Sequence, residues 1–391
     1  MKKILLGTTG LVGAALLASA ASAETPKVTL GGFSDFQAGY VDDNGATQNA
    51  YGFRNDNEVI IKVDGKTDGG LGYGAQIDLE ADITADANNQ GLNAARTFTY
   101  LSGNWGRVEL GGNRSAAATT RVDASSLAVA TGGINGAWNY FVSGAPTGGV
   151  GSGFITNSKL PGEHGSTYTP GDESTYNATK FTYYTPKYAG FQIGVSYTPQ
   201  LADRGQLLNR SDATGVKDVV DAAISYENTF FGAWKFAAAA TGEWASGNGQ
   251  AQGATGPGTV NVPYGTDDIA AYNVGALVGY KGFQIAGSYG DWDESGIAGA
   301  SGNYYTGGVG YETGPIGLSA TWINSSIDEA AGRTNKFNNI VLGADYKLAP
   351  GLTPYAEVSF FDYDSGPTGG AGNTNYNNTG TSVILGTQVA F

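Results

Sequence analysis

Carboxylate side chains recur at every second position in one segment of this sequence. Asp78, Glu80 and Asp82 alternate with Ile77, Leu79 and other apolar residues. Side chains of a β-strand point alternately to opposite faces, so the three carboxylates share one polar face. Clustered oxygen ligands of this kind could hold Ca²⁺. The alternative, a solvated acidic stripe with no ion, is the favoured interpretation.

Residues that catalysis would need are scarce. The chain has no cysteine and one histidine, His164, which stands between Glu163 and Gly165 without a serine motif nearby. Ser152 does not lie in a G-x-S-x-G elbow, and the glycine-rich segments precede predicted strands rather than helices. The residues therefore indicate a protein that is not an enzyme and that requires no cofactor. Calcium is the one metal ion that they suggest.

The overall charge and the first residues indicate where the protein goes. Lys and Arg total 21 and Asp and Glu total 35, for a net charge of −14, which disfavours a nucleic-acid partner. Lys2 and Lys3 precede an apolar stretch over 4–17, and Ala21-Ser22-Ala23 is a small-residue cleavage site. We expect residues 1–23 to be a cleaved signal peptide and residues 24–391 to form one domain.

Alternating apolar and polar residues run through nearly the whole of that domain. Sixteen segments show this period, and the connections between them are alternately short and long. A single sheet of sixteen strands encloses a lumen too wide for side chains to fill, so its apolar face must contact lipid and its polar face water. The pattern predicts an all-β, transmembrane, antiparallel β-barrel with aromatic residues at both membrane interfaces.

Three features together resemble a known family. The segment from Val28 to Tyr40, the long third loop over 116–176 and the terminal Phe391 make the sequence similar to the Gram-negative general porins, of the alphaproteobacterial sixteen-stranded type. The resemblance implies short periplasmic turns, long extracellular loops, a third loop folded into the lumen, and a homotrimer in the outer membrane. It also implies that the barrel-assembly machinery recognises Phe391. Alternatively, Phe391 only completes the aromatic girdle, and the third loop is an extracellular flap.

The resemblance also selects candidate pore residues. We expect the loop to form a constriction with Asp123, Glu163, Asp172 and Glu173, and with Arg121 nearby. The alternation places further charged side chains on the pore wall, where each basic residue could instead be a solvated position away from the constriction. The basic wall residues are Arg54, Lys62, Arg107 and Lys180, and the acidic ones are Asp35, Glu58, Asp78, Glu80, Asp82 and Glu109.

These charges lead to an expected function. Arg54, Lys62 and Arg107 could face the loop carboxylates, giving a transverse field across the pore. Acidic residues outnumber basic ones, which predicts weak cation selectivity. We expect a passive diffusion channel for small hydrophilic solutes and ions. The alternatives are a structural or adhesive barrel with a closed lumen, and a substrate-specific channel, which the shortage of aromatic residues on the polar face disfavours.

Overall fold

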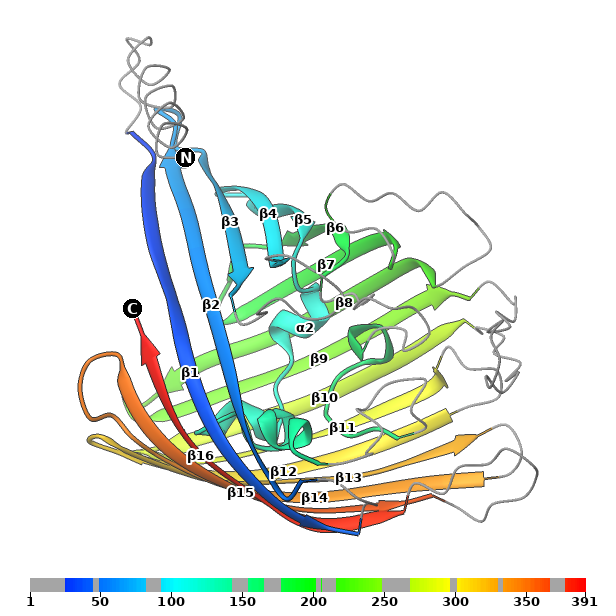
Figure 1. Cartoon of the computed structure of the whole chain (residues 1–391). Coiled ribbons are helices and arrows are strands. Elements are labelled where there is room, and N and C mark those ends of the chain that lie inside the picture. Colours follow the sequence, from blue (N-terminus) through cyan, green and yellow to red (C-terminus); the bar gives the residue numbers. More distant parts are fainter. Residues whose placement is uncertain are drawn as a thin grey trace, which may run out of the picture.

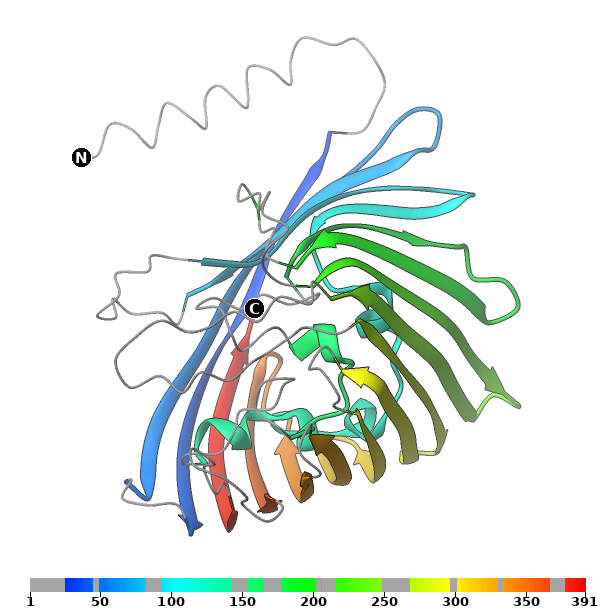
Figure 2. The ribbon, with the colours of Figure 1, turned by 90° about the vertical axis from the view of Figure 1, so that its right-hand side faces the viewer.

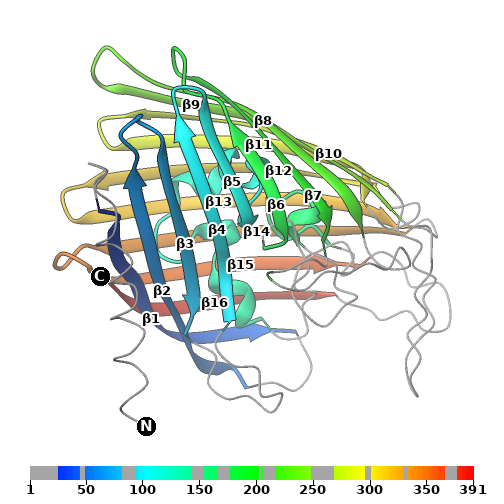
Figure 3. The same ribbon diagram turned by 90° about the horizontal axis from the view of Figure 1, so that it is seen from above.

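The computed structural model describes most of the chain outside the N-terminal segment and several long connections. The described residues are 25–44, 49–81, 93–142, 154–164, 177–201, 205, 216–247, 268–295, 301–329, 333–365 and 377–391. The expected signal peptide, Asp82, Asp172 and Glu173 lie outside them. Within this part of the chain, sixteen antiparallel strands form one closed barrel (Figures 1 and 3), which confirms the predicted fold class.

The strands are long on most of the circumference and short over one arc. They are β1 (Lys27–Asp43), β2 (Tyr51–Lys66), β3 (Gly72–Glu80), β4 (Asn93–Gly103), β5 (Gly106–Gly112), β6 (Thr179–Tyr184), β7 (Phe191–Gln200), β8 (Lys217–Phe230), β9 (Trp234–Ser246), β10 (Ile269–Tyr280), β11 (Phe283–Ser295), β12 (Ser301–Thr313), β13 (Ile316–Glu329), β14 (Arg333–Tyr346), β15 (Leu352–Asp364) and β16 (Asn378–Ala390).

The alternation seen in the sequence becomes two faces of the wall. In β10, Ala271 and Asn273 are buried inside the barrel, whereas Tyr272 and Val274 are exposed on its outer surface. Each strand pairs with its sequence neighbours, and β1 pairs with β16 from Phe33–Ala390 to Asp43–Gly380. This last pairing removes both edges of the sheet, so that its strands have hydrogen-bonding neighbours on both sides, as a lipid environment requires.

The ends of three strands follow from features of the nearby chain. β6 stops at Tyr184, two residues before Pro186, which has no backbone N–H to offer a neighbouring strand. β5 stops at Gly112 because the chain then turns inward, where Ser115 caps a helix with its side-chain oxygen on the amide of Ala118. β3 ends at Glu80, just before a stretch outside the described residues.

The connection between β5 and β6 is called the inner loop (residues 113–178), and its described parts, 113–142, 154–164 and 177–178, lie inside the ring of strands (Figure 2). Its described helices contact β6–β16 in turn. A buried apolar cluster joins this loop to the wall, so the core of the molecule lies within the barrel. The helices are α2 (Ala116–Thr120) and the 3₁₀ helices η1 (Ala124–Leu127), η2 (Gly133–Asn135), η3 (Ala137–Tyr140) and η4 (Pro161–His164).

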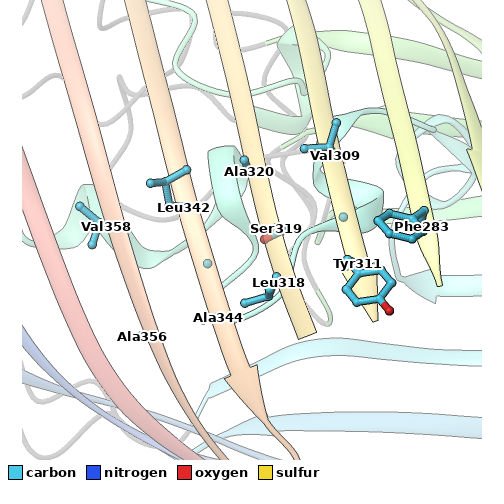
Figure 4. A pocket seen from close by; sticks show the side chains of 12 residues that line it. Phe283, Val309, Tyr311, Leu318, Ser319, Ala320, Leu342, Ala344, Ala356 and Val358 are labelled. Atoms are coloured by element: carbon cyan, nitrogen blue, oxygen red, sulfur yellow. The ribbon is translucent and has the colours of Figure 1, made fainter. Parts of the chain in front are cut away.

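The outer surface is apolar over most of the wall. A depression of about 670 Å³ crosses the outward faces of β11–β15 near the short-turn rim (Figure 4). Phe283 and Tyr311 stand at one side of it, and small side chains such as Ala320 and Ala344 form its floor. It faces away from the lumen and offers no charged group. None of the described helices is long and apolar enough to cross a membrane.

Candidate pore constriction

Glycines on the inward face of the wall create the space in which the inner loop lies. A Cβ atom on Gly275 would overlap the carbonyl of Val122 in the loop. A Cβ on Gly310 would lie 3.2 Å from the carbonyl oxygen of Leu127, and one on Gly343 would lie 3.2 Å from that of Val129. Loop backbone therefore packs directly on strand backbone at these positions, which larger residues would obstruct.

Hydroxyl groups of the same wall accept hydrogen bonds from the loop backbone. The amide of Ala116 donates to Ser196 Oγ at 2.7 Å, and the amide of Val129 donates to Ser319 Oγ at 3.1 Å. The amide of Ala124 donates to Thr306 Oγ1 at 3.2 Å, and the amide of Ile134 donates to Thr321 Oγ1 at 3.1 Å. These side chains satisfy amides that the short loop helices leave unpaired, which fixes the path of the loop.

Two buried carboxylates of the wall add to this attachment. Glu357 of β15 accepts hydrogen bonds from the amide and the hydroxyl of Thr131. Glu243 of β9 accepts one from the amide of Gly162, with an N–O distance of 2.5 Å. Buried oxygens that receive backbone amides in this way pair donors that the loop would otherwise leave unsatisfied. The loop is thus anchored from β7 to β15.

Aromatic rings form the apolar part of the contact between the inner loop and the wall. Trp138 of η3 is fully buried and stacks on Phe337 and Phe361, with ring centroids 5.8 and 6.2 Å apart. Phe154 meets Tyr363 edge to face at 5.3 Å. These inward-facing rings of β14 and β15 form a dry surface under the loop. We call the strands that the loop covers the loop-bearing wall (β7–β16). The part of the lumen beside this wall is therefore filled rather than open to water.

Arg121 holds two of the predicted constriction carboxylates. Its guanidinium pairs with Asp123 at 3.0 Å and with Glu163, which lies 42 residues further along the chain. Both carboxylates are almost completely buried. Burial opposes the charge on Arg121, but the carboxylates of Glu163 and Asp123 outweigh this effect and raise the pKa of Arg121 above its ordinary value.

Asp123 also organises the loop itself. It caps η1 by accepting hydrogen bonds from the amide of Ser125 at 2.7 Å and from the hydroxyl of Ser158 at 2.6 Å. The structure therefore places Asp123 and Glu163 within the folded loop, where Arg121 offsets one of their two negative charges. This corrects the prediction that these carboxylates face the basic side chains of the opposite wall.

Basic side chains of the opposite wall have partners of their own. Arg54 pairs with Asp56 at 2.9 Å and lies 4.1 Å from the ring centre of Tyr140 in the loop. Arg107 pairs with Glu109 at 2.6 Å and covers the ring of Tyr100. Lys62 is exposed on the inward face of β2 and lies opposite Gln76.

Lys180 is buried, although its register places it on the inward face of β6. It donates hydrogen bonds to the carbonyl oxygens of Asn113 and Ala178. It also interacts electrostatically with Asp221. Asp221 lies directly opposite Glu243 in the pairing of β8 and β9, and both carboxylates are fully buried. Lys180 thus balances charge at the edge of the loop attachment rather than standing in open water.

The predicted acidic wall residues also share the inward face where they are described. Glu58, Asp78 and Glu80 lie close together in the register of β2 and β3. Asp78 is fully buried and pairs with Arg96, which lies directly opposite it in the register of β3 and β4. Since Arg96 already supplies positive charge there, Asp78 is poorly suited to calcium.

No group of three or more His, Cys, Asp or Glu residues in the described part of the chain is arranged to hold a metal ion.

A polar cavity of about 450 Å³ remains between the inner loop and strands β1 and β2. The sequence reveals only part of its charged lining, because the loop path is not periodic. Only Asp35 was among the predicted wall residues, and its carboxylate accepts hydrogen bonds from Tyr355 and Gln37 at 2.8 and 3.0 Å. The polar side chains that line the cavity include Asp35, Asp56, Arg114, Tyr140, Asn157 and Lys159.

A closed barrel with a loop packed inside it defines a class of membrane channel, and comparisons with known proteins agree. The model of the Gram-negative porin family matches residues 7–366. The chain is 28% identical to an uncharacterized protein of Rickettsia conorii and 26% identical to one of Rickettsia typhi, with all of each chain covered.

Solved structures show the same fold at low sequence identity. The anion-selective porin from Comamonas acidovorans is 22% identical, with a TM-score of 0.62, covering 94% of this chain and all of that one. OmpT, an outer membrane protein of Vibrio cholerae solved in a trimer form, is 11% identical with a TM-score of 0.62, covering 94% of this chain and all of that one. A mutant of the Rh. blastica porin is 19% identical, with a TM-score of 0.55. The match covers 93% of this chain and all of that one.

The chain therefore belongs to the Gram-negative porin family, which confirms the resemblance seen in the sequence. It is an outer-membrane channel protein and not an enzyme.

Proposed function

We propose that this porin is a water-filled channel through which small hydrophilic solutes and ions diffuse passively, with a weak preference for cations. The observation that carries the proposal is the contrast inside the barrel. The inner loop fills one side, whereas the open wall (β1–β6) keeps charged side chains such as Arg54, Lys62 and Glu58 on its inward face. Charged groups in a wide lumen favour water over a packed interior.

The cation preference rests on the excess of carboxylates. Acidic residues outnumber basic ones by 35 to 21 in the whole sequence. Fields from such an excess raise the local concentration of cations in a pore. The preference should be weak, because ion pairs such as Arg54–Asp56 and Arg107–Glu109 neutralise part of the wall.

Single-channel recording in a planar bilayer tests both statements. Purified protein should give stepwise currents. In a salt gradient, the reversal potential should have the sign expected when cations are more permeant than anions. An absence of steps from correctly folded, heat-modifiable protein would instead support a structural barrel with a closed lumen. A reversal potential of the opposite sign would contradict the cation preference alone.

The outer surface supports a homotrimer. β5 and β6 have 7 and 6 residues, fewer than the roughly 9–11 that a tilted strand needs to cross a bilayer. Ser34 and Asn57, on the outward face of β1 and β2, hydrogen-bond to each other at 2.6 Å in a zone where lipid would favour apolar groups. A neighbouring subunit would cover the outward faces of β1, β2, β5 and β6 better than lipid would. Cross-linking of Asn57→Cys between subunits tests the arrangement.

We also propose that short turns face the periplasm, that long loops face outward and that Phe391 is the signal read by the barrel-assembly machinery. The Phe391 ring is exposed, and its backbone exchanges two hydrogen bonds of 3.0 Å with Gly32. Phe391→Ala should reduce assembly in cells while the purified variant still folds in detergent. Equal losses in both settings would favour the alternative that Phe391 only completes the girdle.

A further inference from the structure

We propose that the outer wall of this porin binds a glycerophospholipid, with an acyl chain in the depression across β11–β15 and the phosphate at Lys281. The proposal rests on the outer-membrane location of the protein and not on its channel activity. The depression measures about 670 Å³, within the range of about 300–1,000 Å³ that is common for small-molecule sites. It faces the membrane, so the ligand that reaches it is a lipid.

The register of the strands explains why the wall is hollowed at this place. Ala344 of β14 lies opposite Leu318 of β13 and Ala356 of β15, and Ala320 lies opposite Leu342 one row further from the short-turn rim. Leu318 and Leu342 are 46% and 44% exposed and stand out beside these alanines. Lipid chains are as apolar as these side chains, so the gain on binding comes from dispersion contacts with a chain that fits the depression.

An aromatic pair marks the end of the depression nearest the rim. The ring centroids of Phe283 and Tyr311 lie 4.2 Å apart. The hydroxyl of Tyr311 points toward the end of its strand (Figure 4). Rings with a polar edge favour the boundary between acyl chains and headgroups. A lipid whose chain lies over Ala320 and Ala344 therefore has its headgroup beside this pair.

Lys281 supplies positive charge at the same end. It is the first residue of the turn between β10 and β11, across which Tyr280 pairs with Phe283. Its ammonium group lies 5.2 Å from the ring centre of Tyr280, which is exposed on the outer surface, so the lysine is on the lipid-facing side. It forms no salt bridge within the described part of the chain. An exposed ammonium group of this kind is suited to a phosphate.

A second depression, of about 590 Å³ across β7–β11, lacks this combination. On β10 its outward residue Ala276 is separated from Tyr280 by Val278, so it ends further from the turn that carries the free lysine. Where it reaches the rim, at β7 and β8, Lys187 is already paired with Glu227 at 2.9 Å. A phospholipid should therefore bind more tightly to the first depression than to the second.

Native mass spectrometry of the purified porin, titrated with phosphatidylglycerol, tests the site. Ala320→Leu combined with Ala344→Leu fills the depression and should weaken binding about tenfold, which corresponds to roughly ten lost carbon–carbon contacts. Lys281→Gln should weaken it about fivefold, the usual contribution of one lysine at a membrane surface. A diacylglycerol with the same chains should bind the wild type as weakly as phosphatidylglycerol binds Lys281→Gln.

Two matched controls separate the site from general effects. Ala238→Leu combined with Ala240→Leu makes the same change in the second depression. Lys347→Gln makes the same charge change at the rim, but at a lysine whose ammonium group lies 3.5 Å from Glu312. Both proteins should bind phosphatidylglycerol as the wild type does.

Several outcomes would overturn the proposal. One is unchanged binding when Ala320 and Ala344 are both leucine and conductance is normal. Another is equal affinity for phosphatidylglycerol and diacylglycerol. Disulfide cross-linking of Ala344→Cys between subunits would show that protein covers the depression, and tighter binding of lipopolysaccharide would assign it to a different lipid. Loss of conductance with phospholipid binding retained would refute the channel function alone.

Discussion

The two halves of the lumen are built from the same alternating strands, yet they differ in what their inward residues do. On the loop-bearing wall these residues are glycines, hydroxyls and aromatic rings, as Gly275, Ser319 and Phe337 illustrate. On the open wall they are charged, as at Arg54, Lys62 and Arg107. Inward-facing residues therefore serve two purposes here. Those of the loop-bearing wall bind the loop, and those of the open wall face the water of the lumen.

The comparison predicts its largest effect at Arg121. Arg121→Met leaves Asp123 and Glu163 buried without a cation, which should destabilise the folded loop by about 3–5 kcal/mol. Hydrogen exchange at the loop amides that bind the wall, such as Ala124 and Val129, measures this loss. As a control, Lys187→Met breaks the exposed pair with Glu227 and should cost at most ~1 kcal/mol. Equal protection in both variants would contradict the prediction.

A smaller effect is expected where the loop backbone touches the wall. Gly275→Leu adds a side chain where Val122 already lies, and overpacking of this kind costs about 1–3 kcal/mol. We expect faster exchange of the loop amides and a larger single-channel conductance. Gly307→Leu is the matched control, because a Cβ on Gly307 points outward and meets only Trp322 at 3.6 Å. Similar conductance in the two variants would rule out the glycine contact as a constraint on the loop.

Glu357→Gln should weaken the attachment modestly. The amide side chain keeps one of the two acceptor oxygens that Thr131 uses and replaces the other with an NH2 group, which should cost about 1 kcal/mol. Exchange at the Thr131 amide should increase while the barrel keeps its melting temperature. Glu312→Gln, at a half-exposed position 3.5 Å from Lys347, provides the comparison. If it increased loop exchange as much, the effect would be one of general charge rather than of this contact.

The smallest effect on stability is expected on the open wall. Lys62 is exposed on the inward face of β2, opposite Gln76, so Lys62→Gln should change the free energy of unfolding by less than ~1 kcal/mol. It should raise the cation preference of the channel slightly, because it removes a positive charge from the lumen. A marked loss of thermal stability would show that the open wall also has a structural role.

Periodicity was enough to predict the barrel and the orientation of its strands. The strand pattern around Asp78 and around Arg54 places both on the inward face, as the register does. Periodicity says nothing about a side chain's partner. The pairing of Arg121 with Glu163 spans 42 residues of loop, and the loop has no repeating pattern from which such a contact could be calculated.

The abundance of glycine also has a cause that composition alone did not reveal. Turns account for residues such as Gly282, whose φ of +89° suits a tight hairpin. Gly275, Gly310 and Gly343 lie instead within strands, beneath the loop. Their positions follow from the path of the loop, so they became interpretable only with that path in view.

The pairing of β1 with β16 imposes an order of events on the exported chain. Gly32 finds its partner in Phe391, beyond β16 in the chain, so the ring cannot close before β16 is available. Contacts so distant in sequence form slowly. The inner loop binds strands from β7 to β16, including those that close the ring last. Loop docking and ring closure are therefore coupled steps, and a variant with a loosened loop should show its defect in the rate of assembly as well as in the finished channel.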